Sequence, residues 1–443
     1  MSATSSFDVV VAGGGAAGIA AAVGARRAGA DVLLVERWPF LGGASTISSV
    51  LTFCGFFDQR HEQVVAGVGA EVLQRLKDYD VYEELAGTSA EGDATHALAD
   101  RIVTVDRDAR LNTGWTGNHF VLLDLETTKH LYDGLVTEAG VTVRLHSTVT
   151  QAVRDDEGRV REITVNDRGG DERITASAFV DASGDGALLA AAGVGVRVEP
   201  ASARQTSTLV CRVGGVAQDA DLSNRGIEQA LTLFAESTGL RFARTRGIAA
   251  RLPVTGQIFL LLIDEQVDAL DAAALTHSEM SARCQARQYM NAFRRHLPGW
   301  HGAHLVETGP QMGIRETRHL RGRASVTGDD VISGRKRPGD SIARCGWPIE
   351  DHAAPGSTRY QSIAGNGWYD IPYGAITSAD TDNLWAAGRL TAADSAAYAS
   401  LRVMGTAFAT GHAAGVSAAL YVHHQRHDIE AVRAELRRQD ALI

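Results

Sequence analysis

Short apolar runs alternate with helix-like segments in the first part of the chain. Residues 9–12 form one such run, and a second run, "DVLLVE", ends at Glu36. Between them lies "GAAGIAAAVGARRAGA", a stretch of small residues with the composition of a buried helix. Short continuous apolar runs are typical of parallel strands that are covered on both faces. The pattern predicts a strand–helix–strand unit and therefore an α/β fold.

Later segments extend the same pattern. "AGVTVRLHSTVTQAVRDDEGRVREITV" and "ITASAFVDASGDGALLAAAGV" are expected to add strands to this sheet, and "DNLWAAGRL" adds one short strand. "TSTLVCRVGGV" and "TGQIFLLLID" predict strands of a separate region. "HSEMSARCQARQYMNAFRRHL" predicts a helix there, because its apolar and charged positions follow helical spacing.

The length of 443 residues is that of two or three domains. We expect a discontinuous Rossmann-like domain, a parallel sheet with helices, formed by residues 1–60, 115–200 and 365–443. A helical insertion is expected over 61–114, with a helix in "QVVAGVGAEVLQRLKDY". An α+β substrate or cap domain is expected over 201–364.

Residues 403–422 carry no formal charge and are long enough to cross a bilayer. They consist mostly of Ala, Gly, Thr and Ser and include His412, so we predict a buried helix of a soluble protein rather than a membrane span. Small residues recur there at every fourth position and form a bare ridge, made of Ala407, Gly411, Gly415 and Ala419. Such a ridge predicts close packing against another helix.

The amino-acid composition argues against several classes of binding partner. The formal net charge of −10 argues against nucleic acid or an anionic membrane as a partner. The four cysteines are far apart and form no CxxC pair, so we expect no metal site, no disulfide framework and a reducing cytoplasm. "MSATSS" lacks the basic start of a signal peptide. Neither a monomer nor a homodimer is favoured by the sequence.

The first strand leads into a glycine fingerprint. Gly13, Gly15 and Gly18 follow the spacing GxGxxG, and Glu36 lies 18 residues beyond the last of them. In such a unit the first glycine permits a tight turn, the second lets a pyrophosphate approach the backbone and the third lets the helix approach the strand. The helix N-terminus attracts phosphates, and the acid accepts ribose hydroxyls. These features predict a dinucleotide site, for either FAD or NAD.

Several stretches together resemble the FAD-binding fold of the glutathione-reductase type. They include "FLGGAST", "DASGDG", "YDIPYGAIT" and "NLWAAGRL…SLRVMGTAFATGHAAGVSAAL". The chain resembles the family of FAD-dependent oxidoreductases that is related to fumarate reductase and succinate dehydrogenase flavoproteins, over about two thirds of its length. A second GxGxxG unit for NAD(P)H is missing, so we expect the flavin to be reduced by the substrate or by a separate reductase.

The resemblance implies FAD as cofactor and assigns it a set of residues. They are Gly13, Gly15, Ala16, Ala17, Gly18, Glu36, Arg37, Gly42, Gly43, Ala44, Ser45, Val149, Ser183, Gly184, Asp185, Gly388, Arg389, Arg402, Val403, Gly405 and Thr406. The start of the last helix is expected to point at the isoalloxazine ring and to stabilise negative charge on it. Other members have Pro-Thr-Cys-like residues after Arg-Val-Met, so we expect substrate or oxygen handling to differ in this chain.

The candidates for catalysis are His352, Tyr398, Arg315 and Arg402, with Tyr373 and Arg318 as further possibilities. His352 in "GWPIEDH" is the candidate base, because the matching segment of the family also ends in Asp-x-His or a similar sequence. The phenols of Tyr398 and Tyr373 are expected near the flavin and could donate or accept a proton. Arg315 and Arg402 would bind a substrate carboxylate, together with Arg318; salt bridges to Glu316 or Asp394 are the simpler alternative.

We expect a dehydrogenase or oxidase that acts on a small organic molecule, with hydride transfer to flavin N5 and with O2 or another compound as electron acceptor. The alternative is a flavin-dependent monooxygenase that is supplied with external reducing equivalents. Halogenation is disfavoured because "GWYDIP" lacks the tryptophans of the halogenase motif. A third possibility is a flavin-binding protein without catalytic activity.

Overall fold

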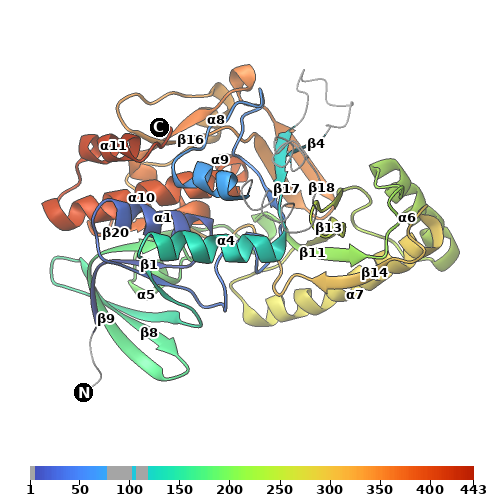
Figure 1. The fold of residues 1–443 in the computed structure, drawn as a ribbon, viewed down its shortest axis with the longest axis horizontal. Coiled ribbons are helices and arrows are strands. Elements are labelled where there is room, and N and C mark those ends of the chain that lie inside the picture. Colours follow the sequence, from blue (N-terminus) through green and yellow to red (C-terminus); the bar gives the residue numbers. More distant parts are fainter. Residues whose placement is uncertain (1–4, 77–101, 106–117) are drawn as a thin grey trace, which may run out of the picture.

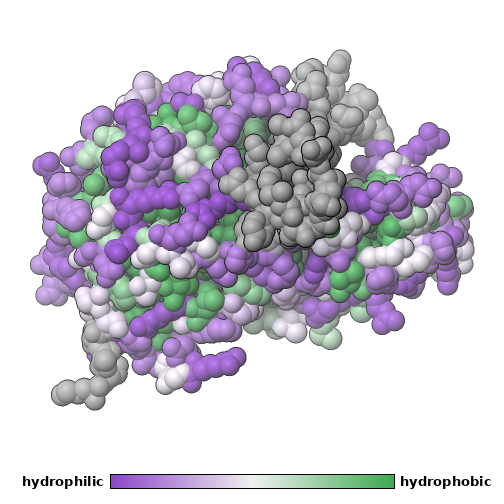
Figure 2. Space-filling view, viewed as in Figure 1, coloured by the Kyte–Doolittle hydropathy of each residue, from purple (hydrophilic) through white to green (hydrophobic). Residues whose placement is uncertain are grey.

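The computed structural model describes residues 5–76, 102–105 and 118–443. The chain forms a larger α/β part and a smaller cap, which lie side by side with the cap at the right of Figure 1. Two separate clusters of buried apolar residues form their cores. On the face shown in Figure 2, the outer surface of both parts is mostly hydrophilic. The predicted combination of a parallel sheet with a further α+β region is confirmed.

A parallel sheet forms the centre of the larger part. Its parallel strands lie in the order β6 (Thr142–Arg144), β2 (Val32–Val35), β1 (Ser5–Ala12), β9 (Gly170–Asp181) and β20 (Leu384–Ala386). The beginning of β9 also pairs antiparallel with β8 (Val160–Asp167), which pairs with β7 (Thr148–Arg154). Residues from the start, the middle and the end of the chain therefore meet in one sheet, at the places that the apolar runs predict.

Helices α1 (Ala16–Arg27) and α10 (Met404–His424) pack closely against each other. A Cβ atom added to Gly411 would lie 2.0 Å from the carbonyl oxygen of Ala17, and one on Gly415 would lie 1.9 Å from that of Ala21. Only glycine fits at these two positions, which confirms the predicted ridge. None of the helices in the described part of the chain combines the length and apolarity needed to cross a bilayer.

Smaller elements surround this centre. The helices are α4 (Leu125–Glu138), α5 (Ala187–Ala191), α8 (Gly328–Ser333), α9 (Ser395–Leu401) and α11 (Ile429–Arg438). The strands pair as β10 (Val196–Val198) with β15 (Arg318–Leu320), β16 (Ser341–Cys345) with β19 (Tyr369–Pro372), and β17 (Ile349–Ala354) with β18 (Ser357–Gln361). A third small sheet has the order β3 (Thr52–Phe53), β5 (Asn118–Leu122) and β4 (Ile102–Val105).

The cap is an antiparallel sheet with two helices. Its strands have the order β12 (Ile248–Arg251), β13 (Ile258–Glu265), β11 (Ser207–Gly214) and β14 (His304–Thr308), and the helices are α6 (Asn224–Thr238) and α7 (Ala272–His296). The two strands and the helix predicted for this region are all present. Buried residues between 320 and 363 join the core of the larger part, so the cap core is narrower than the predicted range 201–364.

The predicted insertion, 61–114, is helical at residues 68–76 and contains strand β4 as well. The helical residues Val68, Val72 and Leu76 are buried in the core of the larger part, and a Cβ atom added to Gly69 beside them would lie 3.4 Å from Cβ of Phe408 in α10. The first part of the insertion is therefore continuous with this core. Its residues 77–101 and 106–114 lie outside the described residues.

The contact between α1 and α10 can be tested with Gly411→Ala and Gly415→Ala. Helix propensity alone would make each substitution stabilising by about 0.5–1 kcal/mol. The overlap with the α1 backbone should instead give a net loss of roughly 1–3 kcal/mol. Thermal unfolding should show a lower Tm for both variants and no change for Gly339→Ala, where an added Cβ atom meets nothing within 4 Å. A higher Tm for both helix variants would contradict this packing.

Candidate cofactor and substrate site

A narrow cleft opens where β1 ends and α1 begins. Gly13 has φ of 99°, and a Cβ atom on it would lie 2.5 Å from Cα of Ser183, so only glycine fits the turn. Gly15 has φ of −75°, and an added Cβ atom would meet no protein atom closer than 3.8 Å. The absence of a side chain at Gly15 therefore leaves the cleft open. At Gly13, in contrast, glycine is required because a side chain would overlap with the backbone of Ser183.

Glu36 follows β2 and lines the same cleft. Its carboxylate accepts hydrogen bonds from the backbone N–H groups of Gly14 at 2.5 Å and Trp38 at 2.9 Å. Burial raises the pKa of Glu36, although these two hydrogen bonds oppose the shift. The carboxylate thus holds the glycine turn and lies at the cleft, where it could accept a further hydrogen bond from a hydroxyl group.

The helix starts give the cleft its electrostatic character. Helices α1 and α10 begin at Gly15 and Val403 and have no side-chain cap. Helices α4, α6, α7, α8, α9 and α11 are each capped by an Asp, Ser or Thr side chain, whereas the short helix α5 starts after Gly186 without one. Uncapped N-termini offer N–H groups and positive partial charge to an anionic or electron-rich ligand.

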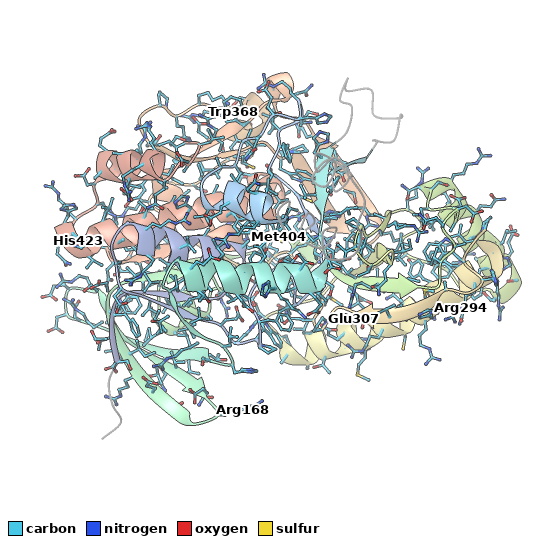
Figure 3. The ribbon with its side chains drawn as sticks, in the orientation of Figure 1. Arg168, Arg294, Glu307, Trp368, Met404 and His423 are labelled. Atoms are coloured by element: carbon cyan, nitrogen blue, oxygen red, sulfur yellow. The ribbon has the colours of Figure 1, made fainter. Side chains whose placement is uncertain are left out.

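Helix α10 begins near the centre of the molecule. Figure 3 shows Met404 there, beside the cap, and His423 at the outer end of the same helix. Two hydrogen bonds fix the first turn of α10. The N–H of Gly405 donates to the carbonyl oxygen of Cys54 at 2.8 Å, and Oγ1 of Thr406 donates to Sγ of Cys345 at 3.2 Å. Met404 lines both the cleft and the neighbouring cavity described below.

The described residues fit FAD. The cleft combines a glycine turn, a space left by Gly15, an uncapped helix start and a carboxylate. Most of the residues predicted for the cofactor line it: Gly13, Gly15, Ala16, Ala17, Glu36, Arg37, Gly42, Gly43, Ala44, Ser183, Gly184, Gly388, Arg389 and Arg402.

Other predicted cofactor residues lie elsewhere in the described structure. Gly18 packs on Gly13, and Ser45 is buried with its hydroxyl on the carbonyl oxygen of Gly42. Val149 belongs to β7, outside the cleft lining. Val403 lines the neighbouring cavity instead. Three more surround the lining without forming it: Asp185, which pairs with Arg37 and Arg389, Gly405 and Thr406.

Several lining residues were missed by the sequence analysis. Trp38, Gln311, Gly313, Ile314 and Met404 all line the cleft. Gly313 and Ile314 directly precede Arg315, so the segment that contains the predicted arginines supplies part of the cleft wall as well. Met404 stands between two predicted residues, Val403 and Gly405, and its position at the helix start was a usable signal.

A cavity of about 590 Å³ lies between the larger part and the cap. It has the size of a small-molecule site. Residues of the cap, such as Thr208 and Leu261, form one side, and residues of the larger part, such as Cys54 and Phe120, form the other. The cavity adjoins the cleft, because both are lined by Ala44, Gly313, Ile314, Arg389, Arg402 and Met404.

One buried carboxylate fixes two arginines of the cavity wall. Arg244 Nη1 lies 3.0 and 2.9 Å from the two carboxylate oxygens of Asp264, and Arg315 Nη1 lies 3.8 Å from the first of them. Burial would raise the pKa of Asp264, but Arg244 and Arg315 lower it overall. Burial lowers the pKa of Arg315 to about 10, so its guanidinium stays charged at neutral pH.

A second carboxylate, that of Glu350, contacts another set of residues around the cavity. It accepts hydrogen bonds from Trp347 Nε1 at 3.0 Å and from the Tyr360 hydroxyl at 2.8 Å. Arg402 donates to the Glu350 carbonyl oxygen at 3.1 Å, and its guanidinium lies 4.0 Å from the carboxylate. Burial would raise the pKa of Glu350, but contacts with His352, Arg402 and Tyr360 hold it well below its usual range.

His352 lines the cavity and is buried. Its Nε2 lies 3.3 Å from Oε1 of Glu350, and its Nδ1 lies 3.2 Å from Oγ1 of Thr358. Burial, and then the charge of Arg315, lower the pKa of His352 to about 4. The imidazole is therefore neutral at pH 7 and can accept a proton.

The structure brings together His352, Arg315 and Arg402, three of the four predicted catalytic residues. The fourth, Tyr398, is buried, and its hydroxyl donates to the carbonyl oxygen of Arg315. The Tyr373 hydroxyl contacts Nδ1 of His427 at 2.8 Å instead of a cavity.

The predicted alternative partners of the arginines are engaged elsewhere. Glu316 accepts from the N–H of Gln205 and contacts His319, and Asp394 caps α9. Arg318 donates to the carbonyl oxygen of Asp185. In the described residues no cluster of three or more His, Cys, Asp or Glu side chains could hold a metal ion.

The remaining cavity residues were not singled out from the sequence. They include Arg244, Glu350, Thr358 and Tyr360. A usable signal lies in the period-two spacing of Glu350 with His352 and of Thr358 with Tyr360, which places each pair on one face of a strand. Arg244 lies in an irregular segment and carries no such signal.

Comparisons with known proteins show the family of the chain. The sequence profile of the family described as "FAD dependent oxidoreductase" matches residues 8–439. The chain therefore belongs to the FAD-dependent oxidoreductase family, and its cofactor is FAD. No curated protein matches the chain significantly.

Solved structures are similar at low identity. A geranylgeranyl bacteriochlorophyll reductase-like protein from Thermoplasma acidophilum is 15% identical, with 98% of this chain and 83% of that chain covered and a TM-score of 0.49. A triple mutant of the flavin-dependent brominase Bmp2 is 14% identical, with coverage of 98% and 84% and a TM-score of 0.47. p-Nitrophenol 4-monooxygenase PnpA from Pseudomonas putida DLL-E4 is 14% identical, with coverage of 72% and 70% and a TM-score of 0.41.

The role of the cleft can be tested with Gly15→Ala. The added methyl group meets no protein atom closer than 3.8 Å, so the FAD-free protein should keep its stability within about 0.5 kcal/mol. The methyl group occupies the approach of the pyrophosphate, so FAD affinity should fall at least about tenfold, or by about 1.4 kcal/mol. Thermal unfolding with and without FAD, together with a fluorescence titration, measures both quantities.

Gly18→Ala is the matched control. Its Cβ atom would lie 1.7 Å from the carbonyl oxygen of Gly13, so this variant should already lose stability without FAD. Unchanged FAD affinity in Gly15→Ala would show that the cleft does not hold the pyrophosphate.

Proposed function

We propose that this FAD-dependent oxidoreductase oxidises a small anionic organic molecule in the cavity between the cap and the FAD cleft. The observation that carries the proposal is a cavity that adjoins the cleft and whose wall combines arginines with a neutral, buried imidazole. An oxidation that removes a hydride and a proton needs an acceptor for each. FAD in the cleft would accept the hydride, and His352 in the cavity wall would accept the proton.

FAD would be held by the cleft residues in the manner of the glutathione-reductase type. Gly15 and the start of α1 would face its phosphates, Glu36 a ribose hydroxyl, and the start of α10 its ring. Bound FAD supplies the two-electron oxidant. Met404, Arg389 and Arg402 line both the cleft and the cavity, so these three residues would lie next to both the cofactor and the substrate.

Charge favours an anionic substrate, such as a carboxylate. The described residues that line the cavity include five arginines, namely Arg244, Arg246, Arg315, Arg389 and Arg402, and one carboxylate, that of Glu350. The wall is thus cationic although the whole chain has a net charge of −10. Nε of Arg402 is buried without a hydrogen-bond partner in the described structure, so this guanidinium has a donor left for the substrate.

The alternative, a flavin-dependent monooxygenase, differs in what reduces the flavin. The purified protein is mixed without oxygen with a panel of α-hydroxy carboxylates, α-amino carboxylates and saturated dicarboxylates. Bleaching of the flavin by a panel member supports the proposed oxidation. Bleaching only by NAD(P)H or a reductase, followed by oxygen incorporation into product, supports the monooxygenase. No redox response to any of these indicates a flavin-binding protein.

The anion-binding role of Arg402 can be tested with Arg402→Met. Loss of a charge-assisted hydrogen bond should weaken binding of the active panel member about ten- to hundredfold. Arg402→Lys should bind with intermediate affinity because it keeps the charge and loses the planar fork. Arg426→Met removes a largely exposed arginine and should change nothing. Equal affinity in Arg402→Met and the unaltered protein would exclude Arg402 from substrate binding.

The proton-accepting role of His352 can be tested with His352→Gln. The amide keeps polar contacts but cannot take up a proton, so anaerobic flavin reduction should slow by about 10²–10⁴-fold with little change in substrate affinity. Stopped-flow absorbance measures this rate. His304→Gln, at an exposed position, is the control. An unchanged rate in His352→Gln would remove this residue as the proton acceptor.

A further inference from the structure

We propose that the hydroxyl group of Thr358 is the catalytic group that takes the substrate proton and passes it to His352, with Glu350 holding the imidazole from behind. The inference rests on the proposed function and identifies the residue that touches the substrate. It follows from the contacts of the two imidazole nitrogens.

Both nitrogens of His352 already have a neighbour. Nε2 faces Oε1 of Glu350 at 3.3 Å, and Nδ1 faces Oγ1 of Thr358 at 3.2 Å. A substrate could reach Nδ1 directly only by displacing the hydroxyl group. Thr358 lines the cavity beside His352 and is partly exposed, so its hydroxyl group contacts Nδ1 and adjoins the space for substrate.

The ionised carboxylate of Glu350 determines which atoms donate in the contacts of His352 with Glu350 and Thr358. Glu350 is ionised and can only accept, and its oxygen also accepts from the Tyr360 hydroxyl. Nε2 of His352 must therefore carry the hydrogen in this contact. In a neutral imidazole Nδ1 is then an acceptor, so the Thr358 hydroxyl donates to it. The free lone pairs of Oγ1 remain for a hydrogen bond from the substrate.

A bulge in the hairpin of β17 and β18 places these groups. Asp351 pairs with Arg359, but Ala354 pairs with Ser357, so His352 and Ala353 together face Thr358. A bulge of this kind redirects side chains and is frequent beside functional sites. Here it turns His352 and Thr358 toward each other, while Gln205 holds the strand by accepting from the N–H of His352 at 2.7 Å.

The proton transfer is balanced. The substrate O–H bond breaks and its proton moves to Oγ1 of Thr358, while the proton of Oγ1 moves to Nδ1 of His352. Thr358 ends as a hydroxyl and His352 as an imidazolium paired with Glu350. For an α-hydroxy carboxylate, bound FAD would supply the two-electron oxidant that takes the hydrogen of the substrate C–H bond with its electron pair, so that a carbonyl group would form.

The polarity of the relay can be measured without substrate. In FAD-loaded protein labelled with ¹⁵N-histidine, the ring shifts of His352 at pH 7 should be those of the Nε2–H tautomer. Subtraction of the His352→Gln spectrum assigns the signal among the 15 histidines. The Nδ1–H tautomer would overturn the relay, because Nδ1 could then not accept from Thr358.

The transfer itself is tested with Thr358→Val and Thr358→Ser. Valine keeps the branched shape without the hydroxyl group, so anaerobic flavin reduction by the active panel member should slow about 10²-fold or more, with substrate affinity changed less than about threefold. Serine should keep the rate within about fivefold. Equal rates for valine and serine would overturn the proposal.

The two hypotheses fail differently. If no panel member bleaches the flavin, the proposed oxidation is wrong, whereas the tautomer of His352 still reports the arrangement of the relay. If oxidation occurs and Thr358→Val is as fast as Thr358→Ser, the oxidation stands and the relay is wrong.

Discussion

The whole site depends on the backbone contact between α1 and α10. Gly411 and Gly415 let α10 approach the carbonyl oxygens of Ala17 and Ala21 at distances that no side chain permits. Because of this contact, the uncapped starts of two helices that are nearly 400 residues apart in the chain lie along one cleft. In FAD the ribityl chain separates the pyrophosphate from the electron-accepting ring, so one helix start could face each of them.

Much of this frame could be predicted from the sequence because its signals are local. The glycine fingerprint, the acid at Glu36 and the four-residue spacing of the last helix each lie within a short segment. The substrate cavity depends on contacts between distant segments, such as Arg244 and Asp264, which no spacing reveals. His352 was found by resemblance, whereas its contact with Thr358 depends on a bulge in the hairpin register.

The two buried carboxylates have different tasks. A buried charge is costly unless it is paired and hydrogen-bonded, and both Asp264 and Glu350 are. Asp264 fixes Arg244 and Arg315 in the wall, so these guanidinium groups are held in place before an anion binds. Glu350 contacts His352 and Tyr360 and lies near Arg402, so it organises the part of the wall that would accept the proton in the proposed reaction.

This division bears on the proposed role of His352 as the proton acceptor. The arginines that would bind an anion also lower the pKa of His352, because positive charge disfavours the imidazolium. An anionic substrate bound between Arg315 and Arg402 would offset part of that charge, so His352 would gain proton affinity when substrate is present. Substrate binding and proton acceptance are then coupled by charge alone, across a wall whose groups are already fixed by Asp264 and Glu350.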